Sequence, residues 1–308
     1  MEYVLETASL RKQYGHYTAL NDVSMHISRG SIYGFVGKNG AGKTTLIRLI
    51  CGLQKPTSGS YTLFGKPYTA KDIKDSRKRM GAVVETPSIY LAMTAEDNLK
   101  EQYRVLGLPS FESIPQLLEL VGLADTGKKK AGNFSLGMRQ RLGIAIALAG
   151  NPDFLVLDEP ANGLDPQGII EMRELILRLN RERHITVLIS SHILDELSRL
   201  ATHYGFIDSG SILKEITAKE LEAACRKCIC VTVDHSQELC AALDVLGLEY
   251  RITSDTEADI YGQPDITKLV QILAEKGCSI RSIREREESL ENYYMNLIGA
   301  QAARNQTA

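Results

Sequence analysis

The sequence predicts an α/β protein with a mainly parallel sheet, followed by a smaller α+β domain. Strand-like and helix-like stretches alternate from residue 1 to about residue 215, as expected for strands joined by helical crossovers. After Gly210 the order of the stretches changes. The alternation is carried by SIYGFVG (31–37), KTTLIRLICG (43–52), FLVLDE (154–159), IIEMRELILRLNRER (169–183) and TVLIS (186–190).

Helical patterns interrupt this alternation between residues 90 and 150, approximately. Apolar residues recur there at helical rather than strand spacing. The sequence therefore predicts a helical subdomain inserted into the α/β domain. Its segments are TAEDNLKEQYRVLG (94–107), SIPQLLELVGL (113–123) and GMRQRLGIAIALAG (137–150).

The last part of the chain, residues 216–308, reads as a separate small domain. Its stretches follow a β-α-β-β-α-β order, which is that of the ferredoxin-like plan. The final segment, AARNQTA (302–308), is expected to be frayed. The strands are KCICVTVDH (227–235), EYRITS (249–254), EADIYG (257–262) and CSIRSIRERE (278–287); the helices are SQELCAALDVLG (236–247), ITKLVQILAEKG (266–277) and SLENYYMNLIG (289–299).

Composition excludes several classes of protein. The 308 residues carry a formal net charge of −2, so no global basic field favours nucleic acid as a partner. The longest apolar stretches, such as Leu142–Gly150, are far shorter than the ~20 residues that cross a bilayer. The first ten residues lack the pattern of a secretory signal. We therefore expect a soluble chain, held at a membrane only by another protein.

A phosphate-binding loop is predicted between the first buried strand and the helix that follows it. GKNGAGKT (Gly37–Thr44) matches the P-loop pattern G-x4-G-K-[ST] in the strand–loop–helix setting that the motif requires. Glycines let the backbone approach phosphates, and successive N–H groups form an anion-binding nest at a helix N-terminus. The residues expected to bind the nucleotide here are Gly37, Lys38, Asn39, Gly40, Ala41, Gly42, Lys43, Thr44 and Thr45.

Two acidic residues end a second buried strand, FLVLDE. Asp158 is expected to hold Mg²⁺ together with Thr44, and Glu159 to polarise the attacking water as a general base. With the P-loop, this strand predicts an ATP- or GTP-hydrolysing protein. Kinases, motors and recombination ATPases remain open on these two motifs alone.

The segment NFSLGMRQRLGIAIAL (Asn133–Leu148) narrows the class. It resembles the signature LSGGQ-x-QR of ABC ATPases, with Leu136 and Met138 departing from the usual glycine and glutamine. The resemblance implies that Ser135 and Gly137 bind the γ-phosphate held by an opposite subunit. Without that role, the segment would be an amphipathic helix capped by Ser135.

Other ABC landmarks follow in order. ANGLDP (161–166) resembles the D-loop, with Asp165 at its aspartate, and LISSHIL (188–194) resembles the H-loop, in which His192 would contact the γ-phosphate and the attacking water. RKQYGHYTALNDVS (11–24) resembles the A-loop. There Tyr14 would stack on adenine, with Tyr17 as the rival for that role, and Ala19 could flank the sugar or base.

One departure points to a branch of this family. Where ABC proteins usually carry the glutamine of the Q-loop, this chain has Glu85, whose carboxylate could meet Mg²⁺ but would repel a γ-phosphate. Glu85, the SLGM signature and the SLENYYMNL segment resemble the ATPases of bacitracin-resistance and lantibiotic self-protection exporters.

The resemblance implies a P-loop ABC core over residues 1–215, with an antiparallel β part beside the mainly parallel sheet. It implies ATP and Mg²⁺ as cofactors and a head-to-tail dimer with a second copy or a paralogous ATPase. It also implies an integral membrane permease as partner, at the cytoplasmic face of the membrane, and export as the direction of transport. A soluble ABC ATPase acting on ribosomes or DNA and an importer ATPase are the alternatives; no nucleic acid is expected.

Overall fold

The computed structural model describes residues 2–225, 228–262, 264–286 and 290–306. The chain divides into two compact units, which are Met1–Ala218 with Ala300–Ala308, and Lys219–Gly299. Four sets of residues at the ends of predicted segments lie outside the described ranges: Lys227, Glu287, Ser289 and 307–308.

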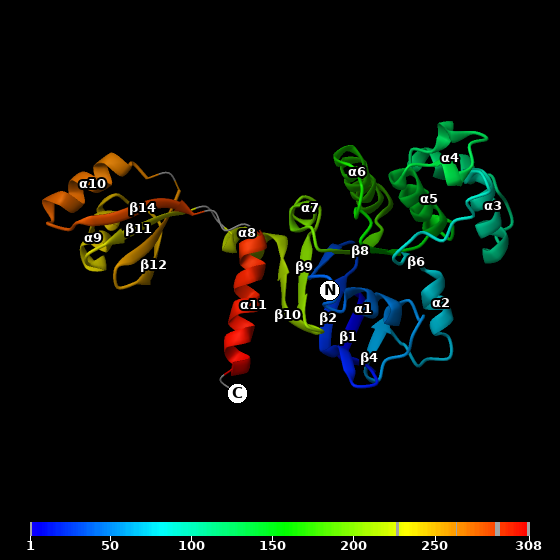
Figure 1. Cartoon of the computed structure of the whole chain (residues 1–308), viewed down its shortest axis with the longest axis horizontal. Coiled ribbons are helices and arrows are strands. Elements are labelled where there is room, and N and C mark those ends of the chain that lie inside the picture. Colours follow the sequence, from blue (N-terminus) through cyan, green and yellow to red (C-terminus); the bar gives the residue numbers. More distant parts are fainter. Residues whose placement is uncertain (1, 226–227, 263, 287–289, 307–308) are drawn as a thin grey trace. The chain divides into compact units, whose positions relative to one another are not determined.

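A six-stranded sheet forms the centre of the first unit (Figure 1). All its strand pairs are parallel except that of β10 with β9. Every residue of β3, β7 and β8 is buried, as expected for central strands covered on both faces. The order is β10 (Ser211–Thr217), β9 (His203–Asp208), β3 (Ile32–Val36), β8 (Thr186–Ser191), β7 (Phe154–Asp158) and β6 (Met80–Val83).

An antiparallel four-stranded sheet packs with the central sheet in the same unit. One apolar core joins the two sheets through the first helix, whose Leu46 and Ile47 are completely buried. The antiparallel β part expected from the resemblance is therefore present. Its order is β2 (Tyr17–Ser28), β1 (Tyr3–Tyr14), β4 (Ser58–Leu63) and β5 (Lys66–Pro67).

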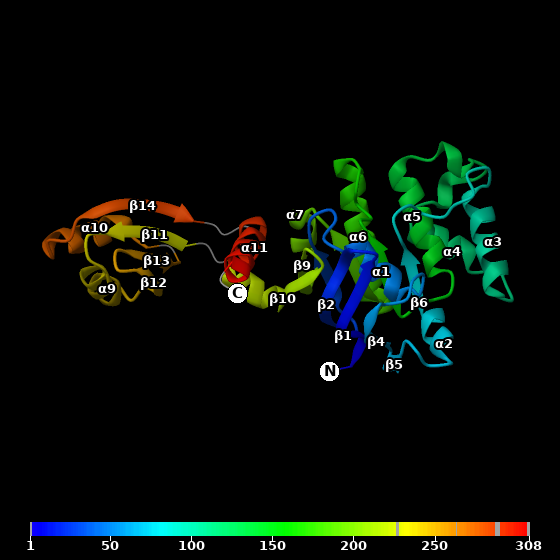
Figure 2. The same cartoon turned by 60° about the horizontal axis from the view of Figure 1, so that its bottom comes forward.

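Three helices of the first unit, α3, α4 and α5, lie together beyond β6 in both views (Figures 1 and 2). They form the helical subdomain, and Thr94 caps α3 by accepting a hydrogen bond from the Asp97 N–H. The helices of this unit are α1 (Lys43–Ile50), α2 (Ile73–Lys78), α3 (Ala95–Leu106), α4 (Ile114–Leu120), α5 (Leu136–Leu148), α6 (Pro166–Arg183) and α7 (Leu194–Ser198), with 3₁₀ turns at Ala124–Thr126 and Ala131–Asn133.

The second unit contains an antiparallel sheet in the order β12-β13-β11-β14. Since β13 lies between β11 and β12, the strands have the split βαβ arrangement of the ferredoxin-like plan. Helices α9 and α10 share an apolar core with β11 and β13. The elements within this unit are β11 (Cys228–Val233), α9 (Ser236–Val245), β12 (Tyr250–Ser254), β13 (Glu257–Tyr261), α10 (Ile266–Glu275) and β14 (Ile280–Arg286). Helices α8 (Ala218–Ala224) and α11 (Leu290–Gln306) cross the boundary between the two units.

Three sequence-based expectations were wrong or incomplete. The segment 302–306 is helical rather than frayed, because alanine, arginine and glutamine extend α11 at little conformational cost. Helix α8 was not predicted, since seven residues are too few to show a helical period. Helix α5 begins at the Ser135 cap but is not amphipathic, because its buried side chains lie on several faces.

Within the described ranges, no helix is both long enough and apolar enough to span a membrane.

Candidate functional site

The predicted phosphate loop joins β3 to α1, and close backbone contacts require glycine at two of its positions, Gly37 and Gly42. A Cβ on Gly37 would lie 2.7 Å from the Ile207 carbonyl oxygen. Gly42 has φ +109°, and a Cβ there would lie 2.7 Å from the carbonyl oxygen of Ala19. Ala19 itself is buried, and its carbonyl packs closely against the loop at Gly42. Lys38, Asn39 and Gly40 form the exposed turn, whereas Ala41 is buried and Thr45 partly buried.

Lys43 is the buried cation of this loop, with 5% of its side chain exposed. Its ammonium donates to the Gly37 carbonyl at 2.6 Å and to the Lys38 carbonyl at 3.2 Å. It also lies 3.1 Å from Glu159 Oε1, at ion-pair distance but without hydrogen-bond geometry. The positive charge is therefore held between the loop and the end of β7.

Asp158 meets Thr44 beside this lysine. Asp158 is 1% exposed at the end of β7, and its Oδ2 accepts a hydrogen bond from the Thr44 hydroxyl at 2.8 Å. The contact links the first turn of α1 to a neighbouring strand end across 114 residues of sequence. A hydroxyl and a carboxylate thus converge where Mg²⁺ was predicted.

Glu159 lies between two basic side chains. Its Oε2 is 2.7 Å from Nδ1 of His192, which follows β8, and its Oε1 faces Lys43. The residue has φ +50°, a left-handed conformation that is uncommon for a residue other than glycine. The sharp turn after β7 directs this carboxylate toward His192 rather than along the strand.

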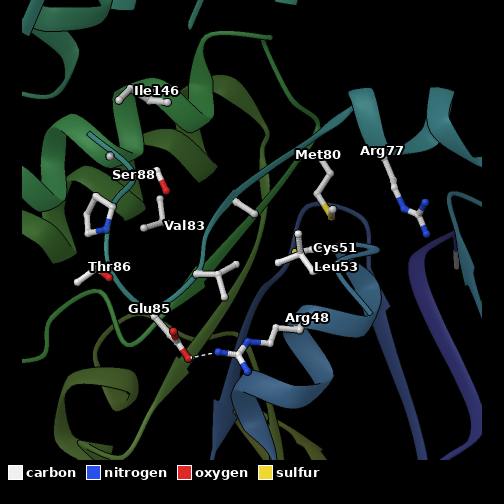
Figure 3. Close-up of a pocket in the computed structure, with 14 residues that line it drawn as sticks. Arg48, Cys51, Leu53, Arg77, Met80, Val83, Glu85, Thr86, Ser88 and Ile146 are labelled. Atoms are coloured by element: carbon white, nitrogen blue, oxygen red, sulfur yellow. Dashed lines mark hydrogen bonds and ion pairs between the residues drawn. The ribbon is translucent and has the colours of Figure 1, made fainter. Parts of the chain in front are cut away.

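Glu85 does not share this cluster of contacts. Its carboxylate pairs at 2.5 Å with Arg48, which lies on α1 five residues after Lys43 (Figure 3). Glu85 also has a left-handed backbone, with φ +60°. A direct role of Glu85 at the metal therefore requires that its carboxylate leave Arg48.

A groove lies along the Glu85 segment (Figure 3), with a volume of about 570 Å³. Leu53, Met80, Val83 and Ile146 are among the apolar residues that line it. A second pocket of about 420 Å³, lined by side chains of α3, shares Ser88 and Ile146 with the first. The first pocket is therefore lined by residues of α1 and of the helical subdomain, and the second adjoins it at Ser88 and Ile146.

Cys51 is the thiol in the wall of this groove. Burial raises its pKa to about 12, with Asp158 acting in the same direction and Arg77 opposing it. The thiol therefore stays protonated near neutral pH and is not a nucleophile for chemistry at the site.

Three predicted residues lie at the N-termini of other helices. Ser135 caps α5 by accepting a hydrogen bond from the Met138 N–H at 3.2 Å, and Asp165 caps α6 through the Gly168 N–H at 3.0 Å. Gly137 lies in the first turn of α5, where an added Cβ would meet only Leu164, at 3.7 Å. Packing within the chain therefore does not require glycine at position 137.

The two candidate tyrosines pair across the tip of the β1–β2 hairpin. Tyr14 is 42% exposed, and its hydroxyl donates to the Gln54 side chain just beyond α1. Tyr17 is 60% exposed. The Gln54 contact anchors Tyr14 to the segment that follows α1, which favours Tyr14 as the stacking residue.

Sequence reasoning missed Arg48, Gln54 and Ser190 at this site. Each contacts a partner far away in sequence, as Ser190 does by donating a hydrogen bond to Asp158, so no local motif marks it. The one available signal was Ser190, a hydroxyl in the otherwise apolar run of VLIS.

The family described as ABC transporter matches residues 20–162. The bacitracin transport ATP-binding protein BcrA of Bacillus licheniformis is 41% identical over 306 residues, covering 97% of this chain and 98% of the relative. The lantibiotic transport ATP-binding protein SrtF of Streptococcus pyogenes is 43% identical over 212 residues, covering 69% of this chain and 90% of the relative.

Among solved structures, the ADP conformation of MJ1267, an ATP-binding cassette of an ABC transporter, matches with a TM-score of 0.65. It is 28% identical, and the match covers 71% of this chain and 92% of that one. The similarity to BcrA, in contrast, extends through the second unit.

Proposed function

Because the chain belongs to the ABC transporter family as an ATP-binding subunit that hydrolyses ATP, we propose that it energises export of a peptide antibiotic of the bacitracin or lantibiotic type through a separate permease. The observation that carries this proposal is the convergence of Lys43, Asp158, Glu159 and His192. The full-length similarity to a bacitracin transport protein supports the cargo class.

The residues beside Lys43 fit a magnesium ion. Thr44 and Asp158 supply a hydroxyl and a carboxylate, the oxygen donors that Mg²⁺ accepts together with phosphates. When bound there, Mg²⁺ would neutralise charge on the β- and γ-phosphates. Lys43 would exchange the carbonyls of Gly37 and Lys38 for phosphate oxygens.

Glu159 is placed to act as the general base. Its carboxylate would accept a proton from the attacking water, and His192 would orient both the carboxylate and the γ-phosphate. The left-handed backbone fixes the direction of this carboxylate before nucleotide arrives.

A second copy would complete the site. Ser135, Gly137 and Asp165 belong to exposed or partly exposed helix starts, as required of groups that act on a partner's nucleotide. Helix N-termini also bind anions well. In this head-to-tail dimer, ATP joins the two copies and hydrolysis releases them.

Replacing Gly137 with alanine is expected to leave the fold of the single chain intact while impairing the site that forms in the dimer. Alanine favours a helix by ~1 kcal/mol over glycine, and Leu164 leaves room for the methyl group, so thermal stability should be unchanged or higher. ATP turnover should fall about tenfold or more, because a methyl group blocks approach of the partner's phosphate and costs a hydrogen bond. Gly299→Ala, in open space on α11, is the matched control. Unchanged turnover in Gly137→Ala would contradict the dimer proposal.

The groove beside Glu85 is the surface on which we place the permease. Its lining combines apolar side chains with the charged pair Arg48 and Glu85, which suits an amphipathic helix. Docking there would bring the permease to the α1 helix that begins at the phosphate loop. The chain would thereby work at the cytoplasmic face of the membrane.

Glu85→Gln is expected to retain basal ATP hydrolysis and to alter coupling. The Glu85–Arg48 pair is largely exposed, so its loss should change basal turnover by about fivefold at most, equivalent to ~1 kcal/mol. Permease-stimulated turnover in reconstituted vesicles should fall further, with the exposed Glu112→Gln as control. Complete loss of basal turnover would show that Glu85 does essential chemistry.

The cargo is tested in the cells that carry this chain. Replacing it with the Glu159→Gln form should lower the inhibitory concentration of bacitracin or of a lantibiotic, while unrelated antibiotics keep theirs. Unchanged sensitivity to all such peptides would remove the cargo proposal and leave the ATPase chemistry in place.

The alternatives left open by the sequence receive no support from the comparisons. Two relatives that match over 97% of this chain are bacitracin transport ATP-binding proteins, from Bacillus licheniformis and Enterococcus faecalis. None of these names points to ribosomes or DNA.

A further inference from the structure

Ser190 is a completely buried polar residue at the centre of the site. It lies on β8, between β3 and β7, and follows the apolar residues Val187, Leu188 and Ile189. A hydroxyl in such a strand costs free energy unless it is hydrogen-bonded. Its partners therefore indicate why a polar residue lies there.

The Ser190 hydroxyl donates one hydrogen bond and accepts another, and both partners belong to the two acidic residues. Ser190 Oγ donates to Asp158 Oδ1 at 2.6 Å and accepts a hydrogen bond from the Glu159 N–H at 3.0 Å. The sheet register places Ser190 directly opposite Asp158. One hydroxyl thus joins the side chain of one acid to the backbone of the next.

The first bond fixes the Asp158 carboxylate. Its other oxygen accepts from the Thr44 hydroxyl at 2.8 Å, so hydroxyls from α1 and β8 hold it on both sides. Because Thr44 spends its only hydroxyl proton on Asp158, its lone pairs remain available to a cation.

The second bond fixes the turn that directs Glu159. The Glu159 N–H also approaches the Ser190 carbonyl at 3.2 Å, and the residue has φ +50°. A left-handed non-glycine residue persists only where its surroundings hold it. Ser190 provides two such contacts, through its hydroxyl and its carbonyl, to the backbone N–H of the general base itself.

We propose that Ser190 is a positioning residue for ATP hydrolysis, which aligns Asp158 and Glu159 through a single hydroxyl. The proposal rests on the roles given above to these two acids. Ser190 would not touch the nucleotide, and its effect would pass through the metal ligand and the base.

The test compares Ser190→Ala with Thr186→Val in the full chain. Thr186 is also completely buried on β8, but its hydroxyl accepts from the Gly30 N–H, outside the site. Each change removes one buried hydroxyl with little change of shape. Turnover, the KM for ATP, Mn²⁺ affinity in the presence of a non-hydrolysable ATP analogue, and thermal unfolding are measured for both.

Ser190→Ala should lower kcat by about 10- to 100-fold, as expected for a misdirected base, with the KM for ATP changed less than threefold or so. Mn²⁺ affinity should fall about tenfold, and Thr186→Val should change neither value. Ser190→Thr, which keeps the hydroxyl, should restore most of both.

Equal kcat and Mn²⁺ affinity in Ser190→Ala and Thr186→Val would overturn the proposal, as would a folded Ser190→Thr as impaired as the alanine form. Glu159→Gln and Asp158→Asn are measured in parallel. They distinguish a failure of the Ser190 proposal from a failure of the roles given to the two acids. If those variants also keep full turnover, the proposed roles of the acids are wrong; if they lose it, only the inference about Ser190 fails.

Discussion

Replacing Glu159 with glutamine is expected to reduce ATP turnover by about 10²- to 10⁴-fold, the usual contribution of a general base. The amide cannot accept a proton from water, but it is nearly the same size as the carboxylate, so the turn after β7 should persist. ATP binding should be retained, because phosphate contacts are made by the loop from Gly37 to Thr44. Steady-state turnover and binding of a fluorescent ATP analogue measure the two effects.

The same variant should accumulate as an ATP-bound dimer. With hydrolysis blocked, the nucleotide that joins the two copies is not removed, and the mass in solution should become twice the 34.0 kDa of one chain. Glu174→Gln, on the exposed side of α6, makes the same charge change away from the site. Multiple rapid turnovers by Glu159→Gln would remove Glu159 from its role.

Replacing Lys43 with alanine is expected to weaken ATP binding by about 10- to 150-fold, since hydrogen bonds to charged groups contribute ~1.5–3 kcal/mol. The structure supplies a second reason. Lys43 faces Glu159 at 3.1 Å, so its removal leaves a negative charge unopposed beside the incoming phosphates. Isothermal titration with a non-hydrolysable analogue measures the loss.

Lys74→Ala, on the exposed side of α2, is the control for removal of a lysine outside the site. Thermal unfolding checks that Lys43→Ala remains folded, because its ammonium also ties the Gly37 and Lys38 carbonyls. An unchanged affinity for ATP in a folded Lys43→Ala chain would contradict the phosphate assignment.

The phosphate loop and the two acids could be predicted because their requirements are local. Eight consecutive residues carry the loop, and a buried strand ending in two acids is visible in sequence. The order of the strands is not local: β7 and β8 are neighbours in the sheet, yet β6, adjacent to β7, comes before the whole helical subdomain. The resemblance, rather than the pattern, supplied the antiparallel sheet.

The fine geometry of the site could not be predicted either, because its contacts join residues that are far apart in the sequence. The Glu85–Arg48 pair joins residues 37 positions apart, and the expectation that Glu85 faces a metal came from its place in the family pattern. The left-handed conformations of Glu85 and Glu159 are set by tertiary contacts and leave no trace in composition. Ser190 showed only as a polar residue in an apolar strand.

We propose that this chain powers a membrane transporter. The most direct test of transport is a pull-down of tagged Glu159→Gln chain, with ATP present, from detergent-solubilised cells that carry it natively. The trapped dimer should retain a multi-span membrane protein in stoichiometric amount, identified by mass spectrometry. Ribosomal or DNA-repair proteins in its place, with no membrane partner, would contradict the transport function.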